Sequence, residues 1–482
     1  MVEVLIVGAG PTGLTLACDL ARRGINCRII ERAGQYGTAS RAKTIQPRSL
    51  EVADDLGVVD RILARGTVHV PTRHYDRDRV VSEAVEAAVG VTPGPDFPYP
   101  APVWIAQPYV EAALRNRLAE LGGRVELGTE VINLVQDANG ATVTVRTAAG
   151  VATIPAQYVV GCDGGRSTIR QLAGFTLHGT SLPEHRWYLG DVRTDRLDRH
   201  CQHLWMTPEH GVLSLFPLPH TDTFQFQASI PADDHEPAEP SLELYQQILD
   251  ERAGLSGVRL SDPSWLSLYR INVAMVDRYR IGRVFLAGDA AHVHSPGGGQ
   301  GMNTGIQDAY NLGWKLAAVL SGTDATLLDT YQTERMPIAR AVLDDSTARL
   351  HMLMRAAGDG DGQRAQRDLT DDFTTGLTIA YPGSPLSCPG SAGRVRAGDR
   401  APDAPSRDTD GRPIRLFDIF RGPHWTLLAF GAAPHLVDTP YGPVRAHAVT
   451  DQTGTARRVY GIPGDGTVLI RPDGHIAAVE MA

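Results

Sequence analysis

The sequence contains three glycine-bearing turns whose residue types could bind a phosphate-containing ligand. The first, GAGPTG at residues 8–13, follows an apolar run and precedes apolar residues at helical spacing. In such a strand–turn–helix unit the first glycine permits a tight turn, the second lets the backbone approach a pyrophosphate, and the third lets helix and strand pack closely. The N-terminus of the helix adds free amides and partial positive charge. The residues predicted to bind phosphate here are Gly8, Gly10, Pro11, Thr12 and Gly13.

A carboxylate follows this unit at the position expected for ribose recognition. Glu31 lies 18 residues after Gly13, at the end of a second predicted strand over residues 26–30. Its carboxylate can accept hydrogen bonds from a ribose diol and would repel a 2′-phosphate. The neighbouring Arg32 is included among the predicted cofactor contacts. The motif by itself does not distinguish FAD from NAD.

The second turn, GCDGGRS at residues 161–167, also follows a predicted buried strand. Its glycines would permit a close approach of the backbone to a ligand, which makes Asp163 a candidate cofactor contact. The alternative is an ordinary strand-to-helix turn in which Asp163 caps the next helix. The sequence leaves both interpretations open.

The third turn begins after a predicted strand over residues 284–287 and continues into a glycine-rich segment, 296–303. Asp289 could accept hydrogen bonds from a polyol such as a ribityl chain. We expect a helix over 304–320 with Asn303 as its N-cap, and its free amides would stabilise the negative charge that a flavin acquires on reduction. The predicted contacts in this region are Gly288, Asp289, Gly299, Gly301, Met302 and Asn303.

The elements that position these turns predict an α/β fold with more than one domain. Strand, helix and strand over residues 2–30 form a parallel βαβ unit. Residues 175–275 are rich in predicted strands, including a hairpin over 212–230, and the composition shifts after about residue 395. A chain of 482 residues also exceeds the size of a single hydrophobic core.

Composition excludes several classes of function. The formal net charge is −9 and basic residues form no block, which argues against nucleic acid as a partner. No apolar stretch reaches the length of a membrane span and no signal peptide is evident, so we expect a cytoplasmic protein without a membrane partner. The five cysteines form no CxxC pair, which predicts neither a metal site nor a dithiol centre.

Together and in this order, the three motifs resemble those of the group A flavoprotein monooxygenases, the FAD-dependent aromatic hydroxylases of the hydroxybenzoate hydroxylase type. The resemblance covers about residues 1–350 and is strongest to actinobacterial polyketide hydroxylases, which carry a stretch similar to residues 288–316. It implies FAD as the cofactor and adds three contacts. Arg41 matches a basic residue near the pyrophosphate, Gln107 matches a glutamine that contacts FAD, and Pro296 matches a proline whose backbone faces the reaction centre.

The same resemblance implies the reaction. NADPH or NADH reduces the flavin, O2 then forms a C4a-hydroperoxide, and one oxygen atom passes to an electron-rich aromatic ring. Because the sequence has no second strand–GxGxxG–helix unit, the nicotinamide cofactor is expected to bind only transiently. For His292 and His294 we expect hydrogen-bonded structural roles rather than acid–base roles.

The resemblance also predicts a domain organisation with a Rossmann-type FAD-binding domain, an inserted β-sheet substrate domain and a thioredoxin-like C-terminal domain. The loop equivalent to the thioredoxin active site would be GAAPH at residues 431–435, which lacks cysteine, so we expect it to serve packing or a homodimer contact. The predicted segments are 1–70, 103–174 and 276–355 for FAD, 71–102 and 175–275 for the substrate sheet, 356–394 as a helical linker, and 395–482 for the C-terminal domain.

The predicted hairpin over residues 212–230 should form one wall of the substrate cavity. Relatives that hydroxylate small acids place serine and arginine on this wall, where the present sequence aligns Phe216 and Leu218, with Phe226 expected to face them. Burying a carboxylate against these side chains would cost several kcal/mol. We therefore expect a neutral or phenolic aromatic substrate with several rings. The alternative is that the three residues are core residues of the sheet.

Other reactions on the same fold stay open from the sequence alone. They are Baeyer–Villiger oxygenation of a polycyclic ketone, an FAD oxidoreductase that inserts no oxygen, and a flavin-binding protein that has lost turnover. The identity of the substrate, the carbon oxidised, the choice between NADPH and NADH, and the oligomeric state also stay open.

Overall fold

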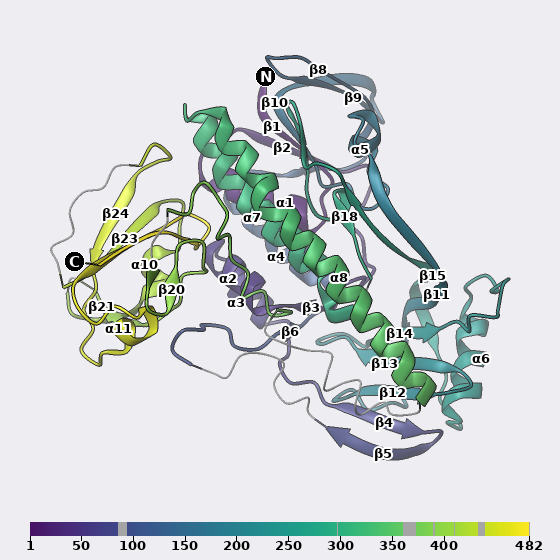
Figure 1. Cartoon of the computed structure of the whole chain (residues 1–482). Coiled ribbons are helices and arrows are strands. Elements are labelled where there is room, and N and C mark those ends of the chain that lie inside the picture. The colour runs from purple at the N-terminus through teal and green to yellow at the C-terminus, as the bar shows by residue number, and fades with distance from the viewer. Residues whose placement is uncertain are drawn as a thin grey trace.

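The computed structural model describes residues 1–84, 94–295, 297–359, 373–388, 391–408, 410–431 and 439–481. Two large sheets and one smaller sheet form the framework, and the long helix α8 (Asp329–Asp359) runs past both large sheets (Figure 1). The predicted α/β class, with an FAD-type sheet, an inserted substrate-side sheet and a C-terminal thioredoxin-like sheet, is confirmed. The domain boundaries given above remain predictions.

The first large sheet contains five adjacent parallel strands, in the order β17-β10-β1-β2-β7. Their sequences are nearly continuous apolar runs such as VEVLIV, as expected for parallel strands that are buried on both faces. The hairpin predicted around residues 137–140 is present as β8 and β9. The strands are β1 (Val2–Val7), β2 (Cys27–Ile30), β7 (Val125–Glu126), β8 (Glu130–Gln136), β9 (Ala141–Thr147), β10 (Gly150–Gly161), β16 (Arg280–Ile281) and β17 (Val284–Leu286).

Helices α1 and α7 pack against each other over this sheet. Proline occupies the first turn of α1, where its missing amide hydrogen costs nothing. α7 begins at Gly301, three residues before the predicted start, and most of its side chains are buried. The helices of this region are α1 (Pro11–Arg22), α2 (Pro47–Asp55), α3 (Val59–Leu63), α4 (Gln107–Glu120), α5 (Thr168–Leu172) and α7 (Gly301–Leu320), and the small sheet beside them pairs β3 (Thr44–Ile45) with β6 (Val103–Trp104).

The second large sheet has the order β18-β15-β11-β14-β13-β12-β4-β5. Its central hairpin, β13 with β14, is the one predicted from alternating residues. Helix α6 covers one face, and α8 packs on the other through Leu350 and Leu353. The elements are β4 (Thr72–Asp76), β5 (Arg79–Ala84), β11 (Leu177–Arg193), β12 (Gln202–Thr207), β13 (Gly211–Pro217), β14 (Thr223–Ser229), α6 (Leu242–Ala253), β15 (Ser261–Val276) and β18 (His292–Val293).

The C-terminal sheet has the order β24-β23-β25-β26, with one parallel pair and two antiparallel pairs. Of the loop predicted at residues 431–435, only Gly431 belongs to the described residues, so its expected role is not addressed. The elements are β19 (Ser391–Ala392), β20 (Val395–Arg396), β21 (Pro405–Arg407), β22 (Pro413–Arg415), α10 (Leu416–Phe420), β23 (Trp425–Phe430), β24 (Val444–Ala448), α11 (Thr455–Tyr460), β25 (Gly466–Ile470) and β26 (Ile476–Met481).

A buried charge network joins the C-terminal sheet to α7 and α8. Arg471, in the turn between β25 and β26, donates to both oxygens of Glu334 at 2.6 and 2.9 Å. Lys315 donates to Glu334 at 2.6 Å, and the Trp314 indole donates to Asp473 at 3.0 Å. Burial raises the pKa of Glu334, but the charges of Arg471 and Lys315 outweigh it, and the pKa lies below its ordinary value. The network therefore consists of ion pairs, which hold the C-terminal sheet against α7 and α8.

We predict that Arg471→Met destabilises the protein by about 3 kcal/mol or more, because it removes the guanidinium that pairs with both the Glu334 and the Asp473 carboxylates and leaves Glu334 with Lys315 alone. The matched control is Arg412→Met, which removes an ion pair with Asp410 in which both side chains are mostly exposed. Urea unfolding of the two variants and the parent checks this. Equal midpoints for both variants would contradict a stabilising role of the network.

Candidate cofactor and substrate site

The carboxyl ends of four parallel strands meet at one edge of the first sheet. Val7 of β1 aligns with Ile30 of β2 and with Gly161 of β10, and Gly161 aligns with Leu286 of β17. Each of these strand ends leads directly into one of the predicted site segments. The structure therefore brings together Gly8, Glu31, Asp163 and Gly288, at the edge where open α/β sheets bind ligands.

The three glycines of the first turn differ in their surroundings. Gly8 has φ +103° and a Cβ there would overlap the Cys162 carbonyl oxygen. A Cβ at Gly13 would overlap the carbonyl oxygen of Gly8, so this position must be glycine for α1 to pack on β1. A Cβ at Gly10, by contrast, would meet no atom within 4 Å. Space for a ligand therefore lies beside Gly10 and not beside the other two.

The N-terminus of α1 faces the same space. Gly10 is its N-cap residue and supplies no side-chain hydrogen bond, so the first-turn amides stay available to an anion. Pro11 opens the helix. Thr12 packs beside Gly288 and Gly305, and a Cβ at either glycine would collide with the Thr12 hydroxyl oxygen. Thr12 thus connects the first turn to the third.

Glu31 lies at the rim of this turn, as predicted. One carboxylate oxygen accepts a hydrogen bond from the Ala9 amide at 3.0 Å, and the other accepts from the Ala33 amide at 3.0 Å. These bonds orient the carboxylate beside the first turn. Arg32 is exposed.

Arg41 and Gln107 occupy neighbouring segments. Gln107, the first residue of α4, accepts from the Ala42 amide at 3.0 Å and donates to Glu111 at 2.8 Å. It thereby holds the loop that carries the exposed Arg41. Burial raises the pKa of Tyr269 on β15 to about 12, with the Asp289 carboxylate adding to the rise and Arg41 opposing it. Tyr269 therefore lies near charges from two separate site segments, and no sequence pattern pointed to it.

The Asp163 carboxylate is already engaged within the protein. It accepts hydrogen bonds from the Ser167 hydroxyl at 2.5 Å and from the Thr168 and Ile169 amides at 2.7 and 3.1 Å. These amides begin α5, so the side chain serves the helix start that the sequence offered as the alternative. Its backbone still borders Gly8, and a contact with the cofactor remains a prediction.

The third turn is anchored by a residue that the sequence analysis missed. The Gly288 amide donates to Asp308 of α7 at 3.1 Å, and Asp308 also bonds His292 at 2.6 Å and Arg335 at 2.8 Å. Burial raises the pKa of Asp308, but Arg335 and His292 outweigh it, and the pKa lies below its ordinary value. Asp289 next to this anchor is exposed. A carboxylate inside an otherwise buried helix was the available signal.

Asn303 is buried but is not the N-cap of α7. The helix begins earlier and places Asn303 in its first turn, because Gln300 occupies the cap position. Its side chain accepts from the Gln46 amide at 2.9 Å and donates to the carbonyls of Thr44 at 3.1 Å and Gly299 at 2.8 Å. Asn303 therefore ties the glycine loop to β3, a contact between segments far apart in the chain.

The other residues predicted in this loop lie around the start of α7. Gly299 is exposed with φ +63°, and Gly301 and Met302 are partly buried in the first turn. Pro296 lies outside the described residues, so its predicted place at the reaction centre is not addressed. His292 and His294 are both buried and hydrogen-bonded, His294 to the Ser295 carbonyl at 3.1 Å. This agrees with structural roles for the two histidines.

The predicted substrate wall divides between two faces of the second sheet. Phe216 aligns with Gln225, and its ring lies 4.5 Å from that of Trp104, centroid to centroid, in a cluster with Leu218. Phe226 aligns with Leu215 and stacks on Tyr245 of α6 at 4.6 Å. The prediction that Phe226 faces Phe216 and Leu218 is therefore wrong, because adjacent positions of a strand point to opposite faces.

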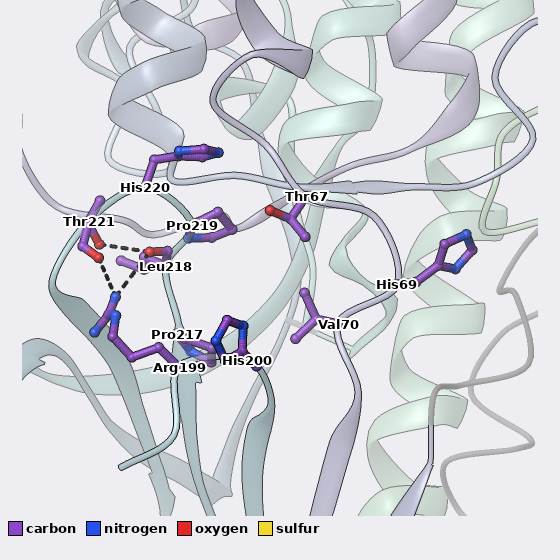
Figure 2. A pocket seen from close by; sticks show the side chains of 10 residues that line it. All are labelled: Thr67, His69, Val70, Arg199, His200, Pro217, Leu218, Pro219, His220 and Thr221. Carbon is purple, nitrogen blue, oxygen red and sulfur yellow. Dashed lines mark hydrogen bonds between the residues drawn. The ribbon is translucent and has the colours of Figure 1, made fainter. Parts of the chain in front are cut away.

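Beside this cluster, a cavity of about 270 Å³ lies between the 67–70 loop and the turn after β13, and Figure 2 shows the side chains that line it. Leu218 and Val70 belong to both the cavity lining and the Phe216 cluster. Arg199 donates to the Leu218 carbonyl at 3.4 Å and also bonds the Thr221 carbonyl, which fixes the turn. Among the predicted site residues only Leu218 lines this cavity. The cavity is therefore separate from the strand edge that carries the predicted cofactor residues.

Within the described ranges, no group of three or more His, Cys, Asp or Glu side chains is arranged to hold a metal ion. None of the helices in the described part of the chain is both long and apolar enough to span a bilayer.

The residues present fit a dinucleotide such as FAD. The space beside Gly10, the uncapped start of α1, the Glu31 carboxylate and the exposed Asp289 all lie along one strand edge. The second sheet faces the same region through Tyr269.

Comparison with known proteins supports this fit. A family model described as "FAD binding domain" matches residues 1–346, and one described as "Aromatic-ring hydroxylase, C-terminal" matches residues 394–482. A flavin-dependent monooxygenase of Mycobacteroides abscessus is 42% identical over 99% of this chain and 96% of its own length. A 6-methylpretetramide 4-monooxygenase of Streptomyces rimosus is 34% identical over 99% of this chain and 90% of its own length.

Solved structures show the same architecture. OxyS, an anhydrotetracycline hydroxylase from Streptomyces rimosus, superposes with a TM-score of 0.80 at 31% identity, covering 99% of this chain and 95% of that structure. An aklavinone-11 hydroxylase in complex with FAD and aklavinone has a TM-score of 0.81 at 26% identity, covering 100% of this chain and 96% of that structure.

The different surroundings of the glycines predict different defects. Gly10→Val should fold like the FAD-free parent but bind no FAD, because its side chain fills the open space at the turn. Gly13→Val should fail to fold stably, because its side chain collides with the Gly8 carbonyl. Visible flavin absorbance and thermal unfolding separate the two outcomes. A Gly10→Val protein with a full complement of flavin would contradict the placement of the pyrophosphate.

Proposed function

The chain belongs to the FAD-dependent aromatic-ring monooxygenases, and on that premise we propose that its substrate is a multi-ring aromatic compound held against the Phe216 face of the second sheet. The observation that carries this proposal is the character of that face. Along the fully described strands β12, β13 and β14, none of the side chains turned to this face is charged. These side chains are Gln202, Leu204, Met206, Val212, Ser214, Phe216, Thr223, Gln225, Gln227 and Ser229.

This face carries both apolar groups and neutral hydrogen-bonding groups. Gln202 donates to Ser214 at 2.8 Å, and Gln227 donates to Gln225 at 2.7 Å. Such a surface suits flat rings that carry ketone and hydroxyl groups, because amides and hydroxyls bond these groups without a buried unpaired charge. The relatives named for 6-methylpretetramide and anhydrotetracycline act on polycyclic compounds of this kind.

FAD supplies the chemistry when bound, accepting a hydride from NADPH or NADH and transferring one oxygen atom of O2 to the ring. We assign the binding of its phosphates to the amides at the start of α1 and the binding of a ribose to Glu31. The residues assigned to the cofactor are Gly8, Gly10, Pro11, Thr12, Gly13, Glu31, Arg32, Arg41, Gln107, Asp163, Gly288, Asp289, Gly299, Gly301, Met302 and Asn303, with Pro296 beside the reacting ring.

The protein contributes positioning and exclusion of water. Asp308 holds the Gly288 turn, and Asn303 holds the glycine loop, so the groups that would face the flavin are fixed before it binds. The N-terminus of α7 would stabilise negative charge on the reduced cofactor. Leu350 and Leu353 of α8 pack on the substrate-side sheet and close that part of its face to solvent.

We also propose that the enzyme acts in the cytoplasm, where reduced nicotinamide cofactors are supplied. Its five cysteines are all free, as is usual in a reducing compartment. A homodimer stays a prediction, and no step of the proposed reaction requires a second copy.

The proposal is tested by screening polycyclic phenols and quinones for accelerated NADPH and NADH oxidation by the purified holoenzyme. We expect a subset to accelerate it and to gain one oxygen atom from 18O2, detected by mass spectrometry. Stimulated oxidation without 18O in the product would indicate an uncoupled ligand. Activity confined to single-ring acids would contradict the assignment of the substrate face.

Placing a charge on the predicted substrate wall should impair substrate binding but not FAD binding. We expect Phe216→Arg to weaken binding of a neutral polycyclic substrate by about tenfold or more, because it buries a second cation near Lys43 and removes ring contact. Phe216→Leu, which keeps an apolar side chain, is the matched control. The flavin content should stay unchanged in both variants. An unchanged KM in Phe216→Arg would show that Phe216 is not part of the substrate wall.

A further inference from the structure

Lysine is almost absent from this chain. The sequence has 46 lysine and arginine residues, and only Lys43 and Lys315 are lysine. Lys315 has an evident structural role, because it donates to Asn311 at 2.8 Å and to Glu334 at 2.6 Å. Lys43 has no hydrogen bond or ion pair from its amine to any other described residue. Its amine is therefore a partly buried cation without a hydrogen-bond or ion-pair partner among the described residues.

Lys43 lies between the cofactor segments and the substrate sheet. Its backbone is fixed, since its carbonyl accepts from the Ile105 amide at 2.9 Å. The next residue, Thr44, is bound through its carbonyl by Asn303 of the glycine loop. From this position the side chain reaches the second sheet, and the Lys43 Nζ lies 4.9 Å from the centroid of the Phe216 ring. The amine thus stands beside the part of the face formed by β12, β13 and β14.

The nearest opposite charge does not neutralise this amine. Asp191 of β11 is the charged group that faces Lys43, and its carboxylate accepts instead from the Ser40 amide at 2.8 Å. Burial lowers the pKa of Lys43 to about 8, with Asp191 opposing the change only in part. Burial likewise raises the pKa of Asp191. An arginine would stay charged here at any physiological pH, whereas a lysine can exchange its proton.

We propose that Lys43 is a specificity-determining residue whose amine binds an acidic phenol or enol oxygen of the substrate as its anion. This inference rests on the proposed function and deepens it. A neutral amine takes the hydroxyl proton, or an ammonium binds an oxygen already ionised; either way the bound pair is ammonium and oxyanion. An ionised hydroxyl also enriches the ring in electrons, which favours transfer of an electrophilic oxygen to that ring.

The probe for the first test is alizarin, a dihydroxyanthraquinone whose phenol and phenolate absorb at different wavelengths. Bound to the FAD-loaded parent, the dye should be the phenolate at a pH where the free dye is largely the phenol. Its affinity should fall above about pH 8, because the Lys43 amine then loses its proton. Lys43→Arg should keep the phenolate spectrum and lose this alkaline decline.

Lys43→Met is the decisive variant, because it keeps the length of the side chain and removes the charge. We expect about tenfold or weaker binding and a bound dye that stays a phenol, with unchanged flavin content. A Lys43→Met protein that binds the phenolate as tightly as the parent would overturn the proposal. Phe216→Leu, which alters the same cluster without altering charge, should leave the ionisation of the bound dye as it is in the parent.

The scarcity of lysine permits a second measurement that needs no turnover. Trace acetylation with acetic anhydride, read by peptide mass spectrometry, should label Lys43 and the N-terminus but little of the paired Lys315. Alizarin should protect Lys43 and leave the N-terminus unaffected. A Lys43 that is unreactive, or equally reactive with and without the dye, would place it outside the substrate site. If instead no polycyclic compound is oxygenated while protection persists, the proposed reaction fails and the binding role stands.

Discussion

The structure depends on a close approach of backbone turns at the carboxyl ends of β1, β10 and β17. Gly8 lies against Cys162, and Gly13 lies against Gly8, in contacts that leave no room for a Cβ. The strand register sets this meeting point, since Val7, Gly161 and Leu286 lie side by side. Because the turns fill one another's space, the free volume beside Gly10 is left as the place where a dinucleotide backbone can enter.

Buried charges then fix what surrounds this meeting point. Asp308 holds the third turn and is itself held by Arg335 and His292. Further along α7, Lys315 joins the ion pairs that bind Arg471 of the C-terminal sheet. Helix α7 therefore begins at the glycine loop and ends in the interface with the C-terminal sheet. Buried pairs of this kind add little net stability over apolar packing, but they impose one arrangement, because a misplaced partner leaves a charge unpaired.

The substrate side combines a face that is uncharged along β12, β13 and β14 with two charged groups beside it, Lys43 and Asp191 of β11. The neutral face explains how polycyclic ligands can be accommodated, but neutral hydrogen bonds alone orient such ligands weakly. Lys43 lies at the edge of that face, held by the segment that also contacts the glycine loop. A ligand anchored there by one ionised oxygen would present a defined ring toward the cofactor. Binding and the electronic activation of the ring would then depend on the same contact.

The sequence by itself determined the features that rest on short-range rules. The strand–turn–helix unit and the β13–β14 hairpin follow from local spacing, and the family follows from the resemblance of the three motifs taken together. The tertiary structure decided which residues meet across the chain. It placed Phe226 on the face opposite Phe216. It also brought the Asn303 side chain to the Gln46 amide, and the Asp163 carboxylate to the amides at the start of α5. These outcomes depend on strand register and on contacts between distant segments, which local spacing does not encode.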